Sequence, residues 1–240
     1  MKLSKVTITG IDERTDVKRL ERLQEKYPFV EWGVLLSSHW NENGNRFPRP
    51  RFLEKLQYHG LQLSAHLCGQ IAKDVLHCEL GPMFEAIEYN FDFFSRCQLN
   101  IRNPKQFFYD LRSMRPFDRI IEEVILQMPD VPTLESFIQF VGKPTPRVAY
   151  LIDGSGGCGI DTPIDVFANP ALHIGYAGGI NVDNVYDKLK TLLNYPSDGR
   201  FWIDMESGVR TDDWLDLDKV EEVLAICHIC QYHIHQINKS

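Results

Sequence analysis

Strand-like and helix-like segments alternate along the whole of this chain, and that alternation limits the folds it can adopt. Eight segments have the apolar patterns of strands, at residues 6–11, 30–38, 61–68, 97–102, 120–128, 148–153, 173–177 and 201–206. Helical patterns lie between and after them, at residues 16–26, 52–58, 105–114, 134–141, 182–193 and 218–232. A helix with a short extra element is expected in 71–95, and a short helix at 163–167. Because strands interleaved with helices form parallel βαβ units, the pattern predicts one α/β domain over residues 1–240, closed as a (β/α)8 or TIM barrel, with an open doubly wound sheet as the alternative.

Length and composition agree with one domain of this kind. The chain has 240 residues, and its 43% hydrophobic and 25% charged residues are ordinary for a globular protein. The formal net charge of −7 argues against a nucleic-acid partner, because phosphate backbones require a basic surface. No apolar run approaches the roughly 20 residues of a membrane span, and the first ten residues lack the apolar stretch of a signal peptide. We therefore expect a cytoplasmic protein without a membrane partner, whose six cysteines remain thiols.

Alternation within the expected strands separates the side chains that face the helices from those that face the barrel axis. In the third strand, for example, Leu63, Ala65 and Leu67 share one face, while His66 and Cys68 share the other. The apolar faces should pack under the helices, so the polar faces should point inward. The inward residues at the strand ends then form a polar ring of Thr9, Ser37, His66, Cys68, Asn100, Gln127, Asp153, Asp204 and Glu206. Barrel enzymes carry their chemistry at this end, and we expect bulky apolar side chains to fill the interior below it; alternatively, some ring members only hydrogen-bond to one another or to buried water.

Two glycine-containing loops predict a phosphate site. Gly178 and Gly179 end the seventh strand just before a helix, and Ser207 and Gly208 follow the eighth strand. Glycines let a backbone approach a ligand closely, N–H groups at a helix start bind anions, and these two loops are the recurrent phosphate site of such barrels. The glycines of the seventh strand could also form only a tight turn. A third cluster at residues 154–159, which includes Gly157, is expected to close on a ligand, or else to be a disordered connection.

The last three strands and their loops resemble the phosphoribosylanthranilate isomerase family. The resemblance rests on the segments Leu151-Ile152-Asp153, Gly156-Gly157-Cys158-Gly159, Ala177-Gly178-Gly179 with Asn184-Val185, and Asp204 with Ser207-Gly208-Val209. Gln98-Leu99 and Arg46-Phe47 extend it to earlier strands. The resemblance implies that Asp153 is the general acid, that Gly178, Gly179, Ser207 and Gly208 hold a phosphate, and that Arg46 faces a substrate carboxylate. We expect Gly157 of the third glycine cluster to contact the phosphate as well.

The chain departs from that family at the position of the general base. The family has a cysteine at the end of the first strand, where this chain has Thr9, and a hydroxyl is too weakly acidic to serve as a base unless another group activates it. The family pattern also changes at Asn100-Ile101 and at Arg210. His66 and Cys68 lie at the end of the third strand, one pleat apart, and we predict that one of them replaces the missing base. The alternative for His66 is a buried histidine hydrogen-bonded to a neighbouring strand.

These observations predict an isomerase that acts on a phosphorylated sugar or its conjugate by acid and base catalysis. Arg46, Asn100, Gln127, Asp204 and Glu206 are the expected substrate-binding residues. One alternative is a binding or sensing protein for a phosphosugar or nucleotide that has kept only the phosphate pocket. An epimerase or aldolase is less well supported, because this chain has no inward lysine at a strand end to form a Schiff base. The expected partner is a phosphorylated small molecule, and a homodimer is left open.

We expect no cofactor and no metal ion. Two metal sites are nevertheless conceivable, because cysteine, histidine and carboxylate groups close together suit zinc. The first comprises Cys227, His228, Cys230, His233 and His235. That segment, however, continues the apolar face of a helix, and no second Cys-x-x-C pair completes a closed site. The second comprises Asp204, Glu206 and His66.

Overall fold

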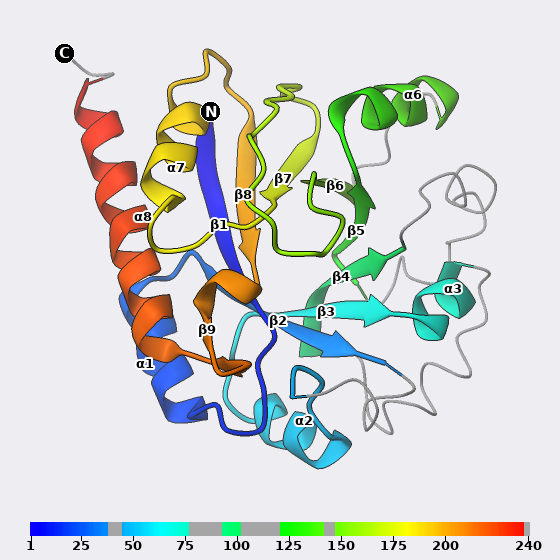
Figure 1. The fold of residues 1–240 in the computed structure, drawn as a ribbon, viewed down its shortest axis with the longest axis vertical. Coiled ribbons are helices and arrows are strands. Elements are labelled where there is room, and N and C mark those ends of the chain that lie inside the picture. Colours follow the sequence, from blue (N-terminus) through cyan, green and yellow to red (C-terminus); the bar gives the residue numbers. More distant parts are fainter. Residues whose placement is uncertain (38–44, 77–92, 102–120, 142–146, 238–240) are drawn as a thin grey trace.

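Eight parallel strands close into a barrel in sequence order, from β1 through β8 and back to β1 (Figure 1). The structure, a computed structural model, describes residues 1–37, 45–76, 93–101, 121–141 and 147–237, without the side chains of 233–237. The strands are β1 (Lys2–Thr9), β2 (Val30–Leu36), β3 (Leu63–Cys68), β4 (Phe94–Asn100), β5 (Glu123–Met128), β6 (Val148–Asp153), β7 (His173–Ala177) and β8 (Arg200–Met205). The predicted (β/α)8 barrel is therefore confirmed, and each expected strand overlaps an observed one.

Helices cover the outside of the barrel. They are α1 (Val17–Lys26), α2 (Pro50–Gln57), α3 (Gln70–Leu76), α6 (Val131–Val141), α7 (Val185–Leu193) and α8 (Leu217–Ile237). Helix α1 begins where the Asp16 carboxylate accepts the backbone N–H groups of Lys18 and Arg19. The predicted helix at 105–114 and the extra element beyond α3 lie outside the described residues. Within the described part, no helix is long and apolar enough to cross a membrane.

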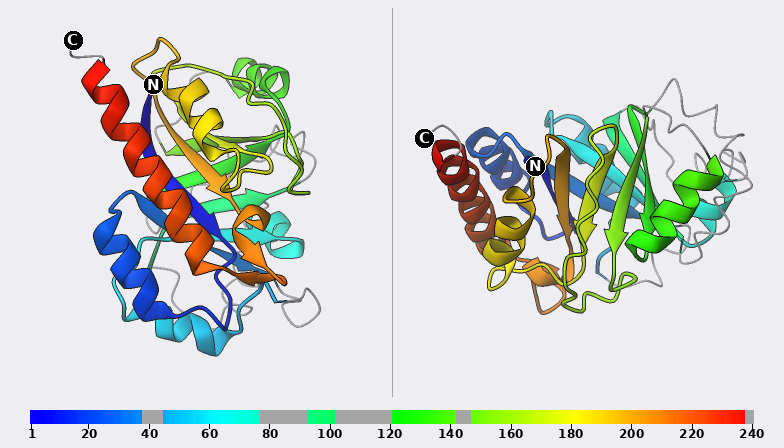
Figure 2. Two further views of the ribbon diagram at one scale, coloured as in Figure 1. Left: turned by 60° about the vertical axis from the view of Figure 1, so that its left-hand side comes forward. Right: turned by 90° about the horizontal axis from the view of Figure 1, so that it is seen from above.

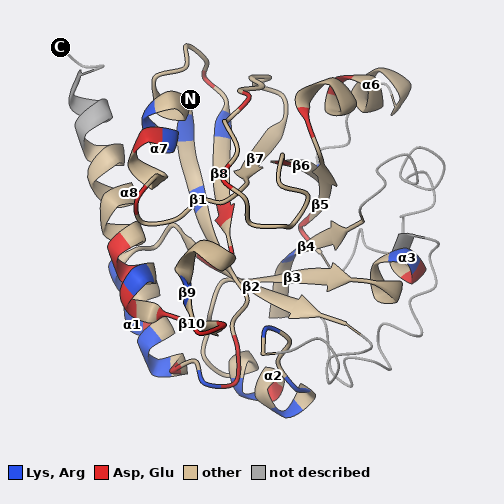
Figure 3. Cartoon of the chain, viewed as in Figure 1, with Lys and Arg blue, Asp and Glu red and all other residues tan. Residues whose placement is uncertain are grey.

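Helices α1 and α8 lie side by side on the outside of the barrel, α8 against β1 and α1 against β2, as the two views of Figure 2 show. Charged residues gather where these two helices meet (Figure 3). Glu221 on α8 pairs with Lys26 at 2.8 Å and with Arg19 at 3.4 Å, both on α1. These exposed pairs contribute little to stability and mainly orient the helices.

The connection from β6 to β7 contains no helix, so the helix predicted at 163–167 is wrong. Pro163 lacks an N–H group, and it also disfavours helical geometry at Thr162 before it. The Tyr176 hydroxyl on β7 donates to the carbonyl oxygen of Phe167 at 2.9 Å and accepts from its N–H at 3.2 Å. Lys188 on α7 donates to the carbonyl oxygen of Thr162 at 2.7 Å. Side chains of the neighbouring elements therefore take backbone groups that a helix would have used.

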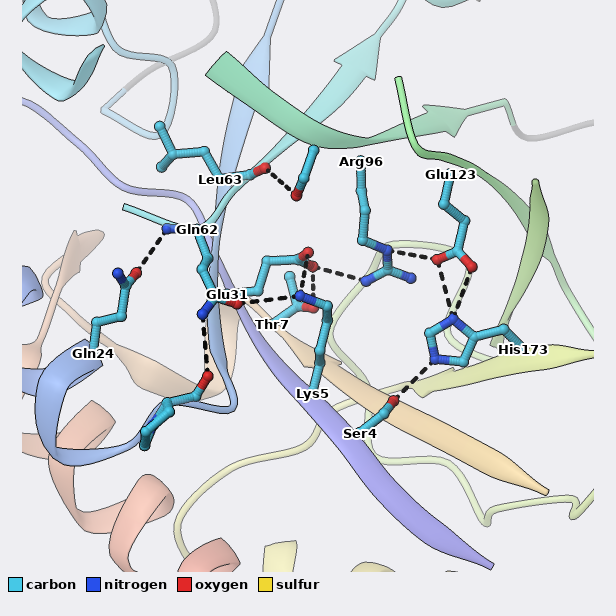
Figure 4. Close-up of polar contacts among 12 residues, drawn as sticks. Ser4, Lys5, Thr7, Gln24, Glu31, Gln62, Leu63, Arg96, Glu123 and His173 are labelled. Atoms are coloured by element: carbon cyan, nitrogen blue, oxygen red, sulfur yellow. Dashed lines mark hydrogen bonds and ion pairs between the residues drawn. The ribbon is translucent and has the colours of Figure 1, made fainter. Parts of the chain in front are cut away.

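The interior of the barrel is largely polar, contrary to the expectation of bulky apolar filling. Among the described residues, the buried apolar cluster there consists of Ile125, Ala149, Leu151 and Trp202. The outward faces of the strands pack instead with the helices in the large outer core. Figure 4 shows the charged residues that occupy much of the remaining interior, among them Glu31, Arg96, Glu123 and His173. They are tolerated because each one pairs with a group of opposite charge or with a hydrogen-bonding neighbour.

Candidate functional site

A cavity of about 750 Å³ opens at the end of the barrel where the strands terminate in the sequence direction. All thirteen residues predicted for the site line it: Arg46, His66, Cys68, Asn100, Gln127, Asp153, Gly157, Gly178, Gly179, Asp204, Glu206, Ser207 and Gly208. The alternation of strand side chains brings them together, because residues two apart on parallel strands face the same interior. The geometry thus joins the predicted residues in one place, while their roles remain predictions.

The loops after β7 and β8 form one wall of this cavity. Gly179 has a φ of +62°, in the left-handed region, and a Cβ there would lie 2.4 Å from the backbone nitrogen of Asp161. A Cβ at Gly208 would lie 2.0 Å from the carbonyl oxygen of Ile180, so the two loops pack closely together. The Asn184 amide fixes the first loop by donating to the carbonyl oxygen of Gly179 at 2.9 Å.

The N–H groups of this wall suit an anion. Within the described residues, hydrogen bonds to other protein groups use none of the four backbone N–H groups of Gly178, Gly179, Ser207 and Gly208. Backbone N–H groups that converge at a loop and a helix start can bind a phosphate without a basic side chain. The N–H group of Gly157 differs, because it donates to Asp153 at 2.7 Å.

Asp153, at the end of β6, faces the cavity with its carboxylate held by four hydrogen bonds. Its oxygens accept from the Gln127 amide at 2.7 Å, from the Ser155 N–H at 3.0 Å and hydroxyl at 2.7 Å, and from the Gly157 N–H. Only 5% of Asp153 is exposed. The glycine loop after β6 therefore wraps around this carboxylate, and the arrangement orients it toward the cavity.

Asp204, near the end of β8, has a pKa raised to about 7. Burial is the main cause, and the negative charges of Glu206, Glu31 and Asp153 add to it, while a hydrogen bond from the Thr9 hydroxyl at 2.7 Å opposes it. A carboxyl group in this range exchanges its proton near neutral pH. Thr9, at the position where the resembled family has a cysteine, thus holds the Asp204 carboxyl group through its hydroxyl.

The two predicted bases on β3 are shifted away from neutrality. Burial lowers the pKa of His66 to about 4 and raises the pKa of Cys68 to about 11, the latter despite a hydrogen bond from the Asn100 amide. Cys68 is therefore a protonated thiol, and His66 a neutral imidazole, at neutral pH. The Nδ1 atom of His66 lies 3.5 Å from the Thr9 hydroxyl oxygen. Both side chains pack against Gly33, where a Cβ would lie 2.5 Å from that oxygen and 3.0 Å from His66 Nε2. The pKa values thus favour Asp204 over the β3 pair for proton transfer.

Arg46 lies at the rim of the cavity and is held by acidic neighbours. It pairs with Glu206 at 2.5 Å and with Asp213 at 2.7 Å, and it donates to the Ser207 hydroxyl at 3.3 Å. An incoming substrate carboxylate would compete with these two acidic side chains for the guanidinium group.

A hairpin that the sequence did not predict supports this rim. It consists of β9 (Arg210–Thr211) and β10 (Trp214–Leu215). The buried Arg210 side chain pairs with Asp12 at 3.0 Å and donates to the carbonyl oxygens of Gly10 at 2.6 Å and Asp213 at 2.7 Å. The arginine that departs from the resembled family therefore ties the loop after β8 to the loop after β1.

Sequence reasoning missed several residues that line the cavity. Lys73 on α3 is an exposed lysine, which the search for lysines at strand ends could not find. Its position in the helix that begins at Gln70, directly after β3, is the signal that would have revealed it. Phe47, Gln98 and Ser155 also line the cavity; all three belong to segments noted in the sequence but were not assigned to the site.

No metal centre is built into the described part of the chain, where no three His, Cys, Asp or Glu side chains group suitably. Cys227 and Cys230 face the outer apolar core from α8. The ring of His228 stacks on Phe29, with 6.3 Å between the ring centres. The side chains of His233 and His235 lie outside the described part.

Comparison with solved structures supports the architecture. The chain is similar to N-(5'-phosphoribosyl)anthranilate isomerase from Pyrococcus furiosus, with a TM-score of 0.54 and 15% identity over 94% of this chain and 98% of that chain. It is also similar to phospho-2-dehydro-3-deoxyheptonate aldolase from Thermotoga maritima, with a TM-score of 0.54 and 12% identity over 94% of this chain and 68% of that chain. The chain is a TIM barrel. No protein-family model and no curated protein matches its sequence, and the structural likeness at these identities extends to the fold alone.

Proposed function

We propose that this TIM barrel is an enzyme that isomerises a phosphorylated sugar, or a conjugate of one, by proton transfer. The observation that carries the proposal is Asp204, a buried carboxyl group with a pKa of about 7 that lines the same cavity as the glycine loops. Such a group both releases and takes up a proton near neutral pH, as an isomerase requires. The structurally similar isomerase from Pyrococcus furiosus has a name that describes a phosphoribosyl compound, which agrees with this substrate class.

The phosphate binds between the loops after β7 and β8 in this proposal. The four unused N–H groups of Gly178, Gly179, Ser207 and Gly208 donate to its oxygens. The sugar then extends across the cavity toward Asp204, while the oriented Asp153 carboxylate accepts hydrogen bonds from its hydroxyl groups.

The reaction is a proton shift between two adjacent carbons. Asp204, as a carboxylate, removes a proton from the carbon next to the carbonyl group, and the electron pair of that C–H bond forms the double bond of an enediolate. The former carbonyl oxygen takes the negative charge, which the Lys73 ammonium group lining the cavity stabilises. A proton then passes from the hydroxyl group of the deprotonated carbon to the former carbonyl oxygen. Asp204 returns its proton to the former carbonyl carbon, and the carbonyl group forms at the carbon that had lost its proton. Asp204 ends as a carboxylate, so nothing else is consumed.

Hydrogen exchange tests the chemistry. Ribose 5-phosphate and a panel of other phosphorylated aldoses are incubated with the protein in D₂O, and proton NMR follows the hydrogen on the carbon beside the carbonyl group. We expect that hydrogen to be replaced by deuterium with at least one substrate. Asp204→Asn should abolish the exchange, because the amide cannot take up the proton.

Calorimetry with inorganic phosphate and ribose 5-phosphate tests the binding site. Gly179→Ala should raise the Kd for phosphate about tenfold or more, since the added Cβ pushes against Asp161. Gly60→Ala is the matched control: Gly60 has a similar φ of +59°, but a Cβ there meets nothing within 4 Å, and Gly60 does not line the cavity. Phosphate binding without exchange in any substrate would indicate a binding or sensing protein, and the absence of phosphate binding would overturn both functions.

A further inference from the structure

Six buried polar atoms in the barrel interior have no hydrogen-bond partner among the described residues. They belong to inward-facing side chains of β2, β3, β4 and β8 and are Glu31 Oε2, Ser64 Oγ, His66 Nε2, Arg96 Nη2, Gln98 Oε1 and Trp202 Nε1. Glu31 Oε2 also forms an ion pair with the Lys5 ammonium group on β1, which at 3.6 Å lies beyond hydrogen-bond distance. At most 4% of any of these six residues is exposed. Buried polar atoms are almost always paired, so six of them within one barrel indicate bound partners.

Water fits these atoms better than an ion does. Arg96 Nη2 and Trp202 Nε1 can only donate a hydrogen bond, whereas Glu31 Oε2 and Gln98 Oε1 can only accept one. An anion would suit the donors and repel Glu31, and a cation would suit the acceptors and repel Arg96. Water both donates and accepts, and buried waters typically make about three hydrogen bonds to such groups.

Glu31 and Arg96 also belong to a chain of ion pairs and hydrogen bonds that crosses the interior from β2 to β7 (Figure 4). Glu31 on β2 accepts from the Thr7 hydroxyl at 2.9 Å and from Arg96 on β4 at 2.8 Å. Arg96 also pairs with Glu123 on β5 at 2.7 Å, and Glu123 accepts from His173 on β7 at 2.9 Å. Glu31 is fully buried, while Glu123 and His173 keep 18% of their side chains exposed.

At the cavity end of the interior, Thr9 connects His66 with Asp204. The Thr9 hydroxyl donates its one proton to Asp204 at 2.7 Å, so in the 3.5 Å contact with His66 Nδ1 its oxygen can only accept. His66 therefore carries its proton on Nδ1, and its Nε2 is an acceptor that needs a donor. The negative charge of Glu31 acts on both His66 and Asp204.

We propose that ordered water molecules occupy this part of the interior and join the Glu31 carboxylate to His66, Thr9 and Asp204, which makes Glu31 a positioning residue for the proton of Asp204. The inference rests on the proposed function, in which Asp204 moves the substrate proton, but the water and the titration of Asp204 are both measured without substrate. Other titratable groups also act on Asp204, namely Glu206 just after β8 and Asp153 on β6, while His66 on β3 contacts the Thr9 hydroxyl that holds Asp204.

A crystal structure of the full chain at high resolution tests the water. We expect water oxygens within hydrogen-bond distance of Glu31 Oε2, Arg96 Nη2 and His66 Nε2. An interior in which these three atoms contact only protein atoms or an ion would overturn the proposal.

Carbon NMR of protein labelled at the aspartate carboxyl carbons tests the positioning role, with Asp204→Asn used to assign the signal. Glu31→Gln should lower the titration midpoint of Asp204 by on the order of one pH unit, since a repelling negative charge is lost. Glu123→Gln is the matched control, because Glu123 also pairs with Arg96 but its charge does not act on Asp204. The midpoint of Asp204 should therefore shift clearly less in Glu123→Gln than in Glu31→Gln. Glu31→Asp, which keeps the charge, should move the midpoint back toward the wild-type value and serves as the second variant if Glu31→Gln does not fold.

Equal midpoints in the wild type and Glu31→Gln, or equal shifts in Glu31→Gln and Glu123→Gln, would overturn the positioning role. If Glu31→Gln does not fold, a Glu31→Asp midpoint as low as that expected for Glu31→Gln would do the same. A protein that shows the expected midpoints but exchanges no substrate hydrogen would contradict the proposed function and leave this inference standing.

Discussion

Asp204 and His66 are buried near each other, and burial should make them change the stability of the fold in opposite directions as the pH rises. Burial raises the pKa of Asp204 from 3.8 to about 7, so between these values the folded chain holds a proton that the unfolded chain has released. Stability therefore falls as the pH rises through this window. Burial lowers the pKa of His66 from 6.5 to about 4, so in that window the unfolded chain binds the extra proton and stability rises with pH.

The two effects are similar in size. One pKa unit corresponds to about 1.4 kcal/mol, so the Asp204 shift of about three units is worth about 4 kcal/mol and the His66 shift about 3 kcal/mol. In the wild type they nearly cancel between pH 4 and 6.5. Asp204→Asn removes one of them, so the free energy of unfolding of this variant, relative to the wild type, should increase by about 4 kcal/mol between pH 4 and pH 8. His66→Gln should show the opposite trend, gaining relative to the wild type as the pH falls from 7 to 4.

Urea unfolding at a series of fixed pH values and constant ionic strength measures these differences. Asp183→Asn is the matched control, because this exposed side chain meets water in both the folded and the unfolded state. Its difference from the wild type should stay nearly constant over the series. A difference between Asp204→Asn and the wild type that is the same at pH 5 and at pH 8 would refute the reasoning for Asp204.

Three further substitutions test the packing around the site. Gly175→Ala would place a Cβ 2.1 Å from the buried ring of Trp202 and should lower the free energy of unfolding in urea by about 3 kcal/mol or more. Adding Trp202→Leu to this variant should restore part of the loss, and an unchanged stability of Gly175→Ala would contradict the clash. Arg210→Met leaves the Asp12 carboxylate buried without its cation and should lower the free energy of unfolding by about 3–5 kcal/mol. The double variant with Asp12→Asn should recover part of that loss, and equal stabilities of the single and double variants would argue against the ion pair. Asn184→Ala removes the hydrogen bonds that fix the glycine loop and should raise the calorimetric Kd for inorganic phosphate about tenfold, and an unchanged Kd would show that the loop needs no such support.

The barrel could be predicted because its determinants are local and repeated. Each strand has an apolar face of alternating residues, each helix has an apolar stripe, and eight repeats of that pair leave few architectures open. The connection at 163–167 could not be predicted in the same way. Its conformation depends on Tyr176 and Lys188, which reach its backbone from β7 and α7, and a pattern within the segment carries no record of those contacts.

The members of the site were predictable, but the chemistry of each member was not. Alternation along the strands and the position of the glycines are enough to place His66, Asp153 and Asp204 around one cavity. The pKa values of His66 and Asp204 depend on burial and on neighbours from other strands. Among the described residues, Asp153 receives four hydrogen-bond donors, whereas Asp204 receives the Thr9 hydroxyl alone and is acted on by three other carboxylates, a difference that appears only in three dimensions.

In the proposed function, the charged interior explains how a threonine can stand at the end of β1 in an acid and base site. A hydroxyl there cannot serve as a base by itself, but it can hold a carboxyl group from β8 in place. That carboxyl group then needs an environment that keeps its pKa near neutrality, and burial beside Glu31 and Glu206 provides one. Bulky apolar filling would have supplied the burial without the negative charge. Replacing the interior ion pairs with apolar residues of similar volume should therefore leave the barrel folded while lowering the pKa of Asp204, which separates the structural role of the interior from its effect on the site.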